Sequence, residues 1–148
     1  LVKSSAASDV YKRQVYTLRA GKKIVDLCFV IKKTDTDIFA CIRYWLIEIG
    51  SEKGLLLGPL AVRKDMQRHG LGSMLINHSL EIAKEKKFKF CFVSGESDYY
   101  PKFGFNRIKQ KNLILPGAID PERLHIIFFE EGIENKMGDK PWTVKSSN

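Results

Sequence analysis

The chain has 148 residues, of which 44% are hydrophobic and 28% charged, and its formal net charge is +8. This length and composition predict one globular domain that buries roughly two-thirds of its unfolded surface. No apolar run reaches about 18 residues without a charge, so no membrane-spanning helix is predicted. The first residues contain no apolar stretch of the kind found in signal peptides, so no signal peptide is predicted. The excess of basic residues is compatible with binding to a polyanion such as nucleic acid. The favoured explanation of the positive charge is a solvated helix face together with the phosphates of a small ligand, so nucleic acid is not the expected partner.

The three cysteines, Cys28, Cys41 and Cys91, lie in apolar, strand-like runs. Buried reduced thiols explain them, which favours a cytoplasmic location. We expect no metal site, because the sequence shows no Cys-x-x-Cys or His/Cys ligand spacing.

The first fourteen residues show neither strand alternation nor a helical stripe, and they are similar to the translated read-through of a sequencing-library adapter. We interpret residues 1–14 as a non-native segment. The expected domain then spans residues 15–131, and residues 132–148 form a polar C-terminal tail of uncertain order.

Three strands are predicted next in the chain. Residues 24–31 alternate and are rich in β-branched side chains, and residues 38–49 and 55–62 form longer apolar runs. Polar turns at 33–37 and 50–54 join them, so the three strands should form an antiparallel meander.

The second half of the domain alternates helix and strand. Leu71, Leu75, Ser79 and Ala83 recur at four-residue spacing, which predicts a helix from residue 71 to 86. Residues 88–94 should form a strand parallel to 55–62, residues 99–103 a turn or two of helix, and residues 124–130 a last strand. The order predicts an α/β (α+β) domain.

Between the third strand and the helix lies a polar turn, residues 67–72, with glycines at Gly70 and Gly72. Glycine lets the backbone approach a ligand closely, and a helix N-terminus offers unpaired N–H groups, so the turn predicts an anion cradle. Ser73 follows where a nucleotide-triphosphate loop needs Lys, and Leu75 stands where a dinucleotide fingerprint needs a third small residue. Neither nucleotide motif fits.

The pattern Q-x-x-G-x-G after Leu60-Ala61-Val62 resembles the acyl-CoA cradle of GNAT-type N-acyltransferases. The resemblance extends to Gly58-Pro59, to Tyr100-x-x-x-Gly104-Phe105 and to segments 115–117 and 121–123, as in small bacterial GNAT proteins predicted to be N-acetyltransferases. It covers roughly residues 20–131. It implies the GNAT acyl-CoA N-acyltransferase fold, a mixed, mostly antiparallel sheet with a splayed parallel pair and flanking helices. The family's first strand and helices would be largely missing here, so we expect an N-terminally truncated domain.

The resemblance also implies a binding site for acetyl-CoA. Pro59 lacks an N–H and, beside Gly58, predicts a bulge in the strand. The backbones of Leu60, Ala61 and Val62 would then pair with the pantetheine amides and polarise the thioester carbonyl. The pyrophosphate would be wrapped by the cradle residues Gln67, Arg68, His69, Gly70, Leu71, Gly72 and Ser73.

The catalytic residues follow from the chemistry that the family performs. A departing thiolate gains from a proton, and the resemblance places Tyr100 beside the sulfur as the donor, with Tyr99 as the alternative. The ammonium of the acceptor must lose a proton, and Glu96 or Glu48 can take it directly or through water.

The sequence therefore predicts an enzyme that transfers acetyl from acetyl-CoA to a primary amine, a small molecule or a peptide, by direct attack in a ternary complex. The sequence shows no evident Ser or Cys nucleophile with a nearby His, which argues against a covalent acyl-enzyme intermediate. A non-catalytic acyl-CoA-binding module and a basic nucleic-acid-binding protein are the alternatives. Pairing with a second copy stays open.

Overall fold

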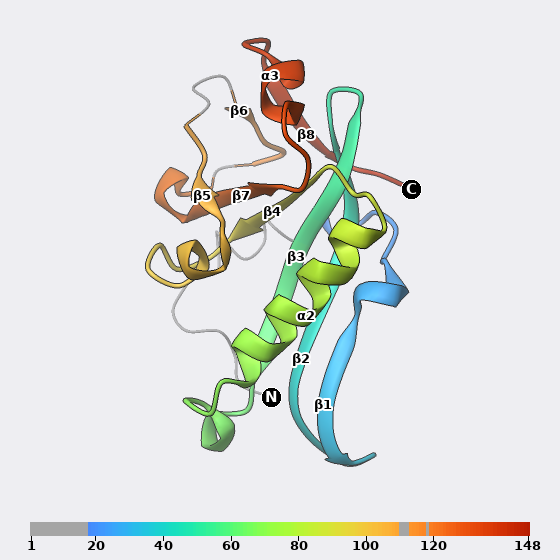
Figure 1. The fold of residues 1–148 in the computed structure, drawn as a ribbon, viewed down its shortest axis with the longest axis vertical. Coiled ribbons are helices and arrows are strands. Elements are labelled where there is room, and N and C mark those ends of the chain that lie inside the picture. Colours follow the sequence, from blue (N-terminus) through green and yellow to red (C-terminus); the bar gives the residue numbers. More distant parts are fainter. Residues whose placement is uncertain (1–17, 110–112, 118) are drawn as a thin grey trace.

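The computed structural model describes residues 18–109, 113–117 and 119–148, so the segment 1–14 interpreted as non-native lies outside the described residues. Within the described part, eight strands form one sheet in the order β5-β7-β4-β3-β2-β8-β6, and β1 pairs with β2. Figure 1 shows this sheet with the long helix α2 on one side. The predicted α/β architecture is confirmed.

The meander β1 (Phe29–Thr34), β2 (Asp37–Ile49) and β3 (Glu52–Val62) is antiparallel throughout, as predicted. The first strand, however, begins later than the predicted residue 24. The backbone N–H of Leu27 donates to Ile24 O at 3.0 Å, which closes the short 3-10 helix η1 (Val25–Leu27) ahead of β1. Local turn hydrogen bonds therefore replace the first residues of the expected strand.

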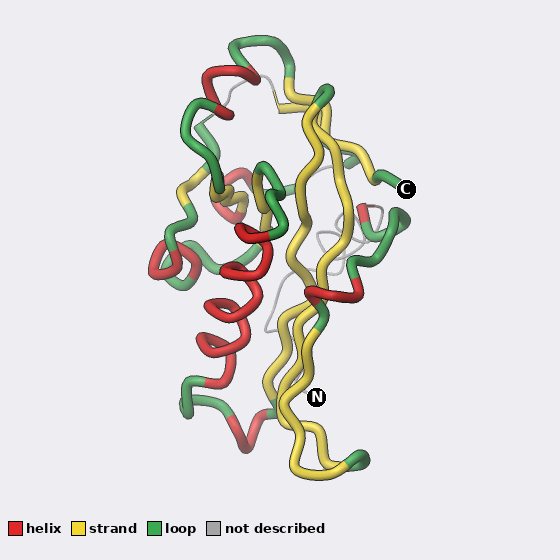
Figure 2. Tube along the Cα trace, turned by 45° about the vertical axis from the view of Figure 1, so that its right-hand side comes forward, coloured by secondary structure: helices red, strands yellow, loops and turns green. Residues whose placement is uncertain are grey.

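Helix α2 (Leu71–Glu85) follows β3 through the short 3-10 helix η2 (Lys64–Met66), close to the predicted bounds. Its apolar stripe, which includes Leu75, Ile76 and Ala83, is buried against the meander because these positions recur on one helical face. Figure 2 shows α2, in red, along one side of the yellow strands.

A polar contact ties α2 to the sheet within this core. The Ser79 hydroxyl lies 2.7 Å from the Tyr44 hydroxyl and donates to Leu75 O at 2.6 Å. Both side chains are buried, so the contact satisfies polar atoms that would otherwise cost stability. Of the cysteines, Cys91 is fully buried, but Cys28 and Cys41 are only half-buried.

Strand β4 (Phe90–Ser94) follows α2 in the chain and runs parallel to β3, as predicted. The two strands pair only at Leu55↔Cys91 and Leu56↔Phe92, although both continue beyond these residues. On its other edge β4 pairs fully with β7 (Leu124–Phe128). The expected splay of the parallel pair is therefore present, and it opens one edge of β3.

The segment predicted as a polar tail is structured. After β7 the chain forms α3 (Ile133–Met137) and then β8 (Trp142–Ser146), which pairs antiparallel with β2 and parallel with β6 (Leu113–Ile114). Trp142 and Val144 are buried in a second core on the other face of the sheet. Among the described residues, no helix is long and apolar enough to cross a membrane.

Candidate active site

A bulge interrupts β3 where glycine and proline were expected to produce one. Tyr44 is opposite Leu57 and Ile42 is opposite Leu60, so β3 carries one residue more than β2 over this interval. The Trp45 indole Nε1 donates to Gly58 O at 2.7 Å and fixes the bulged backbone. Pro59 has no backbone N–H, so at this position the bulge leaves no hydrogen-bond donor of β3 without its partner in β2.

Past the bulge, one edge of β3 faces the opening between β3 and β4. The backbone N–H of Arg63 donates to Phe39 O at 2.7 Å, which directs the polar groups of Arg63 toward β2. Main-chain groups alternate along a strand, so Ala61 also faces β2, whereas Leu60 and Val62 present theirs on the open edge. An extended chain can therefore add to the sheet here.

This open edge leads into the predicted cradle. Arg68 (φ 67°) and Gly70 (φ 78°) are left-handed, and this turn aims the start of α2 at the opening. The N-cap residue of α2 is Gly70, which has no side chain to bond the first turn, so the N–H groups and positive dipole end of α2 suit an anion. Gln67 Nε2 donates to Val62 O at 3.3 Å and joins the turn to the strand.

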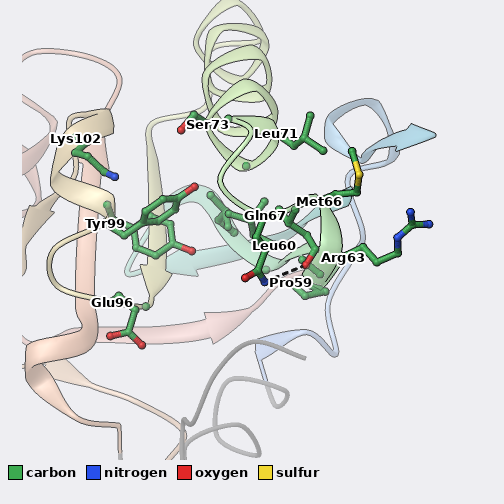
Figure 3. A pocket seen from close by; sticks show the side chains of 18 of the residues that line it. Pro59, Leu60, Arg63, Met66, Gln67, Leu71, Ser73, Glu96, Tyr99 and Lys102 are labelled. Atoms are coloured by element: carbon green, nitrogen blue, oxygen red, sulfur yellow. Dashed lines mark hydrogen bonds between the residues drawn. The ribbon is translucent and has the colours of Figure 1, made fainter. Parts of the chain in front are cut away.

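These elements line a cavity of about 1120 Å³ between β3, the N-terminus of α2 and the end of β4 (Figure 3). Of the predicted residues, the structure brings together at this cavity Leu60, Ala61, Val62, Gln67, Arg68, Gly70, Leu71, Gly72, Ser73, Glu96 and Tyr100. His69 is exposed and is not among the lining residues. Glu48 lies opposite Lys53, near the far end of the hairpin, and is also not among them.

The two adjacent tyrosines have different surroundings. The Tyr99 phenol oxygen reaches the first turn of α2, where it lies 2.7 Å from the position that a β-carbon on Gly72 would take, and Lys102 Nζ lies 4.6 Å from the centre of the Tyr99 ring. Partial burial raises the pKa of Tyr99, and the Ser73 side chain opposes that rise. Tyr99 therefore bridges the short 3-10 helix η3 (Tyr100–Phe103) and α2 across the cavity.

The side chain of Tyr100 is buried. Its ring packs against Phe105, with centroids 5.7 Å apart, and lies 6.3 Å from the ring of the buried His125. Burial raises the pKa of Tyr100 well above its ordinary value, so the phenol stays protonated through the physiological range. A buried phenol that keeps its proton and lines the cavity suits a proton donor.

Glu96 forms an ion pair with Arg123, whose Nη1 donates a hydrogen bond to Glu96 Oε1 at 3.1 Å. Arg123 precedes β7 at the end of the short helix η4 (Pro121–Arg123) and lines the same cavity. In the sequence, Arg123 belongs to segment 121–123, which resembles the GNAT family, but no role in the site was predicted for it. Nothing local indicates its role, since residues 96 and 123 meet only through the pairing of β4 with β7.

The cavity is electropositive. Its described lining contains six cationic side chains, and Glu96 is the one carboxylate among these residues. Arg63 is neutralised by Asp37 and Asp65. The remaining excess of positive charge favours an anionic ligand.

Comparison with known proteins agrees with this geometry. Residues 25–107, more than half of the chain, match the family model "Acetyltransferase (GNAT) domain". A GNAT-family N-acetyltransferase from Escherichia coli, solved with CoA, is similar at TM-score 0.65 and 18% identity over 94% of this chain and 76% of that one. An acetyltransferase from Brucella melitensis, solved with acetyl-CoA, gives TM-score 0.57 and 22% identity over 85% and 72% of the two chains.

A third structure, a GNAT-family acetyltransferase from Staphylococcus aureus, gives TM-score 0.54 and 15% identity over 82% of this chain and 75% of that one. No curated protein matches the sequence. At these identities the solved structures establish the fold, and the family model establishes the membership. The chain belongs to the GNAT acetyltransferases.

Proposed function

We propose that this protein transfers the acetyl group of acetyl-CoA to a primary amine by direct attack in a ternary complex. The observation that carries the proposal is the open edge of β3, which leads straight into the uncapped N-terminus of α2. The solved structures from E. coli and B. melitensis hold CoA and acetyl-CoA, which supports the same co-substrate here.

Each part of acetyl-CoA has a partner in this cavity. The pyrophosphate accepts hydrogen bonds from the first N–H groups of α2, in the turn formed by residues 67–73. The pantetheine amides pair with the open edge at Leu60 and Val62, as an added strand would. One N–H of that edge then polarises the thioester carbonyl, which stabilises the oxyanion of the tetrahedral intermediate.

The transfer requires two proton movements. The neutral amine attacks the thioester carbon, the C–N bond forms, and collapse of the intermediate breaks the C–S bond. Tyr100 lines the cavity in its protonated form and gives its phenolic proton to the departing sulfur. After the attack the nitrogen carries one proton too many, and Glu96, held by Arg123, accepts that proton through a water molecule. Solvent then returns a proton to Tyr100 and takes one from Glu96, which restores the starting state of the enzyme.

Titration calorimetry with CoA and a thiol-release assay over a panel of amines test the proposal together. We expect CoA to bind and at least one amine to release thiol from acetyl-CoA. Binding without turnover would favour the non-catalytic acyl-CoA-binding module instead. Tight, steeply salt-dependent DNA binding without CoA binding would favour the nucleic-acid-binding alternative.

Tyr100→Phe tests the proton donor. Loss of one phenolic oxygen should lower kcat by about 10²–10⁴-fold, the range typical of general acids, and leave the CoA Kd unchanged. Tyr99→Phe is the matched comparison, since it removes the neighbouring hydroxyl, which lies beside Gly72 in the same cavity. A drop in kcat with Tyr99→Phe and none with Tyr100→Phe would move the acid role to Tyr99.

A further inference from the structure

The ion pair between Glu96 and Arg123 is fixed in place by the backbone around it. Gly95, at the end of β4, donates its N–H to Arg123 O at 2.9 Å, and Arg123 donates its own N–H to Asp120 O at 3.0 Å. The Nδ1 of the buried His125 lies 3.1 Å from the same Arg123 oxygen. Backbone hydrogen bonds therefore anchor the segments that carry both partners, although Glu96 lies in the loop after β4 and its side chain is exposed.

This pair lies at the opposite end of the cavity from the cradle. Figure 3 shows Glu96 on one side of Tyr99 and Ser73, in the first turn of α2, on the other. The phosphates of acetyl-CoA belong at the α2 side, so the Arg123 guanidinium is not placed to hold them. It stands instead near Tyr100, where the acetyl group and the acceptor amine must meet.

A second arginine outside the cradle lines the cavity: the Nη2 of Arg19 lies 2.8 Å from the position that a β-carbon on Gly58 would take. Among the described lining residues, the one carboxylate is Glu96. The buried Nε of Arg123 has no hydrogen-bond acceptor within the described part, so an anion beside this guanidinium would stabilise a charge that the protein leaves incompletely paired.

We propose that the acceptor is an amine that carries a carboxylate next to its amino group, that is, an amino acid. This inference rests on the proposed function and names its substrate class. The guanidinium fork of Arg123 binds the carboxylate, and Glu96 faces the amino group that will be acetylated. A zwitterion complements an ion pair because each charge of the ligand meets the opposite charge, and guanidinium geometry matches a planar carboxylate.

The test compares acceptors that differ only in this carboxylate. The full chain is assayed with saturating acetyl-CoA against the L-amino acids and the corresponding amino-acid amides, which keep the amine and lose the negative charge. We expect kcat/KM for the best acids to exceed that for their amides by about 10- to 100-fold, as for one charge-assisted hydrogen-bonded contact. Arg123→Gln should raise KM for the acids by a similar factor and leave KM for the amides unchanged.

Arg107→Gln is the matched control, because Arg107 also pairs with a glutamate, Glu122 (3.6 Å), but is not among the residues that line the cavity. CoA titration of the Arg123 variant reports whether it is folded. Should that variant fail to fold, inhibition of the unaltered protein by N-acetyl amino acids against N-acetyl amino-acid amides gives the same comparison. Stronger inhibition by the acids supports the proposal, and equal inhibition refutes it.

The possible results distinguish failure of the proposed function from failure of the proposed substrate class. A protein that binds no CoA refutes the proposed function and this inference with it. A protein that binds CoA and acetylates amides or carboxylate-free amines as well as acids refutes the inference alone. Binding of CoA with no turnover of any acid, or an Arg123→Gln variant whose KM rises equally for acids and amides, also counts against it, whereas a fall in kcat common to both is expected because Glu96 loses its partner.

Discussion

Gly95 is the position at which a single added methyl group should most directly disturb the site. A β-carbon there would lie 2.1 Å from Cε2 and 2.8 Å from Cδ2 of Tyr100. Carbon atoms in ordinary contact are about 3.5–4.0 Å apart, so in Gly95→Ala the ring must move by more than about 1 Å. Phe105 and His125, each 1% exposed, stand behind it and restrict that retreat.

Overpacking of this kind costs about 1–3 kcal/mol, so Gly95→Ala should lower the free energy of unfolding by that amount in urea denaturation. A 1 Å displacement of a reacting group can cost about 10²-fold in rate, so turnover should fall by about that factor while CoA still binds. The double variant Gly95→Ala/Tyr100→Ala is the control, because with the ring removed the added methyl should cost almost nothing. Equal destabilisation in both backgrounds, or full activity of Gly95→Ala, would show that this reasoning is wrong.

Three further predictions concern the core and the cradle. Trp142→Ala should lower the free energy of unfolding by about 3–5 kcal/mol in urea denaturation, because the indole is buried; a cost near zero would mean that β8 is not part of the stable fold. Gly72→Val should weaken CoA binding, measured by calorimetry, by at least about 1.4 kcal/mol or tenfold, since a β-carbon already reaches 2.7 Å from a phenol oxygen across the cradle. Burial raises the pKa of Tyr44, Tyr100 and Cys91, so the stability they contribute is intact below their ordinary values, about 8.5 for cysteine and 10 for tyrosine, and is lost as pH rises from there through the raised values. Urea titrations between pH 8 and 11 should show unfolding free energies falling by up to about 1.4 kcal/mol per pH unit for each group, and Tyr44→Phe should flatten the slope; an unchanged slope would exclude the Tyr44 contribution.

Local chemistry made the elements around the site predictable. The four-residue repeat from Leu71 to Ala83 is a property of one helix, and the structure places that helix at Leu71–Glu85. Glycine at positions 58 and 70 permits backbone angles of positive φ, which the bulge and the cradle both use. These features depend on neighbours in the chain, so spacing and residue type were sufficient to predict them.

The features that the sequence did not reveal have a common cause: each depends on a contact between distant parts of the chain. Trp142 and Val144 are spaced two apart, as strand residues are, but the five-residue strand gains its stability from pairing with β2, nearly a hundred residues earlier. Without that partner the segment is too polar to be recognised as part of the core. Likewise Glu48 was a fair candidate base by residue type, and only its register opposite Lys53 removes it from the cavity.

The amino-acid sequence by itself determined the α/β class, the meander, the cradle at the start of α2 and the resemblance to the acyltransferases, because each follows from periodicity, turn residues or a contiguous motif. The tertiary structure decided which of two adjacent tyrosines is buried, that residues 132–148 complete the sheet, and that Arg123 meets Glu96. Those arrangements depend on the order of the strands, and strand order is fixed by the packing of two cores on opposite faces of one sheet, which no local pattern specifies.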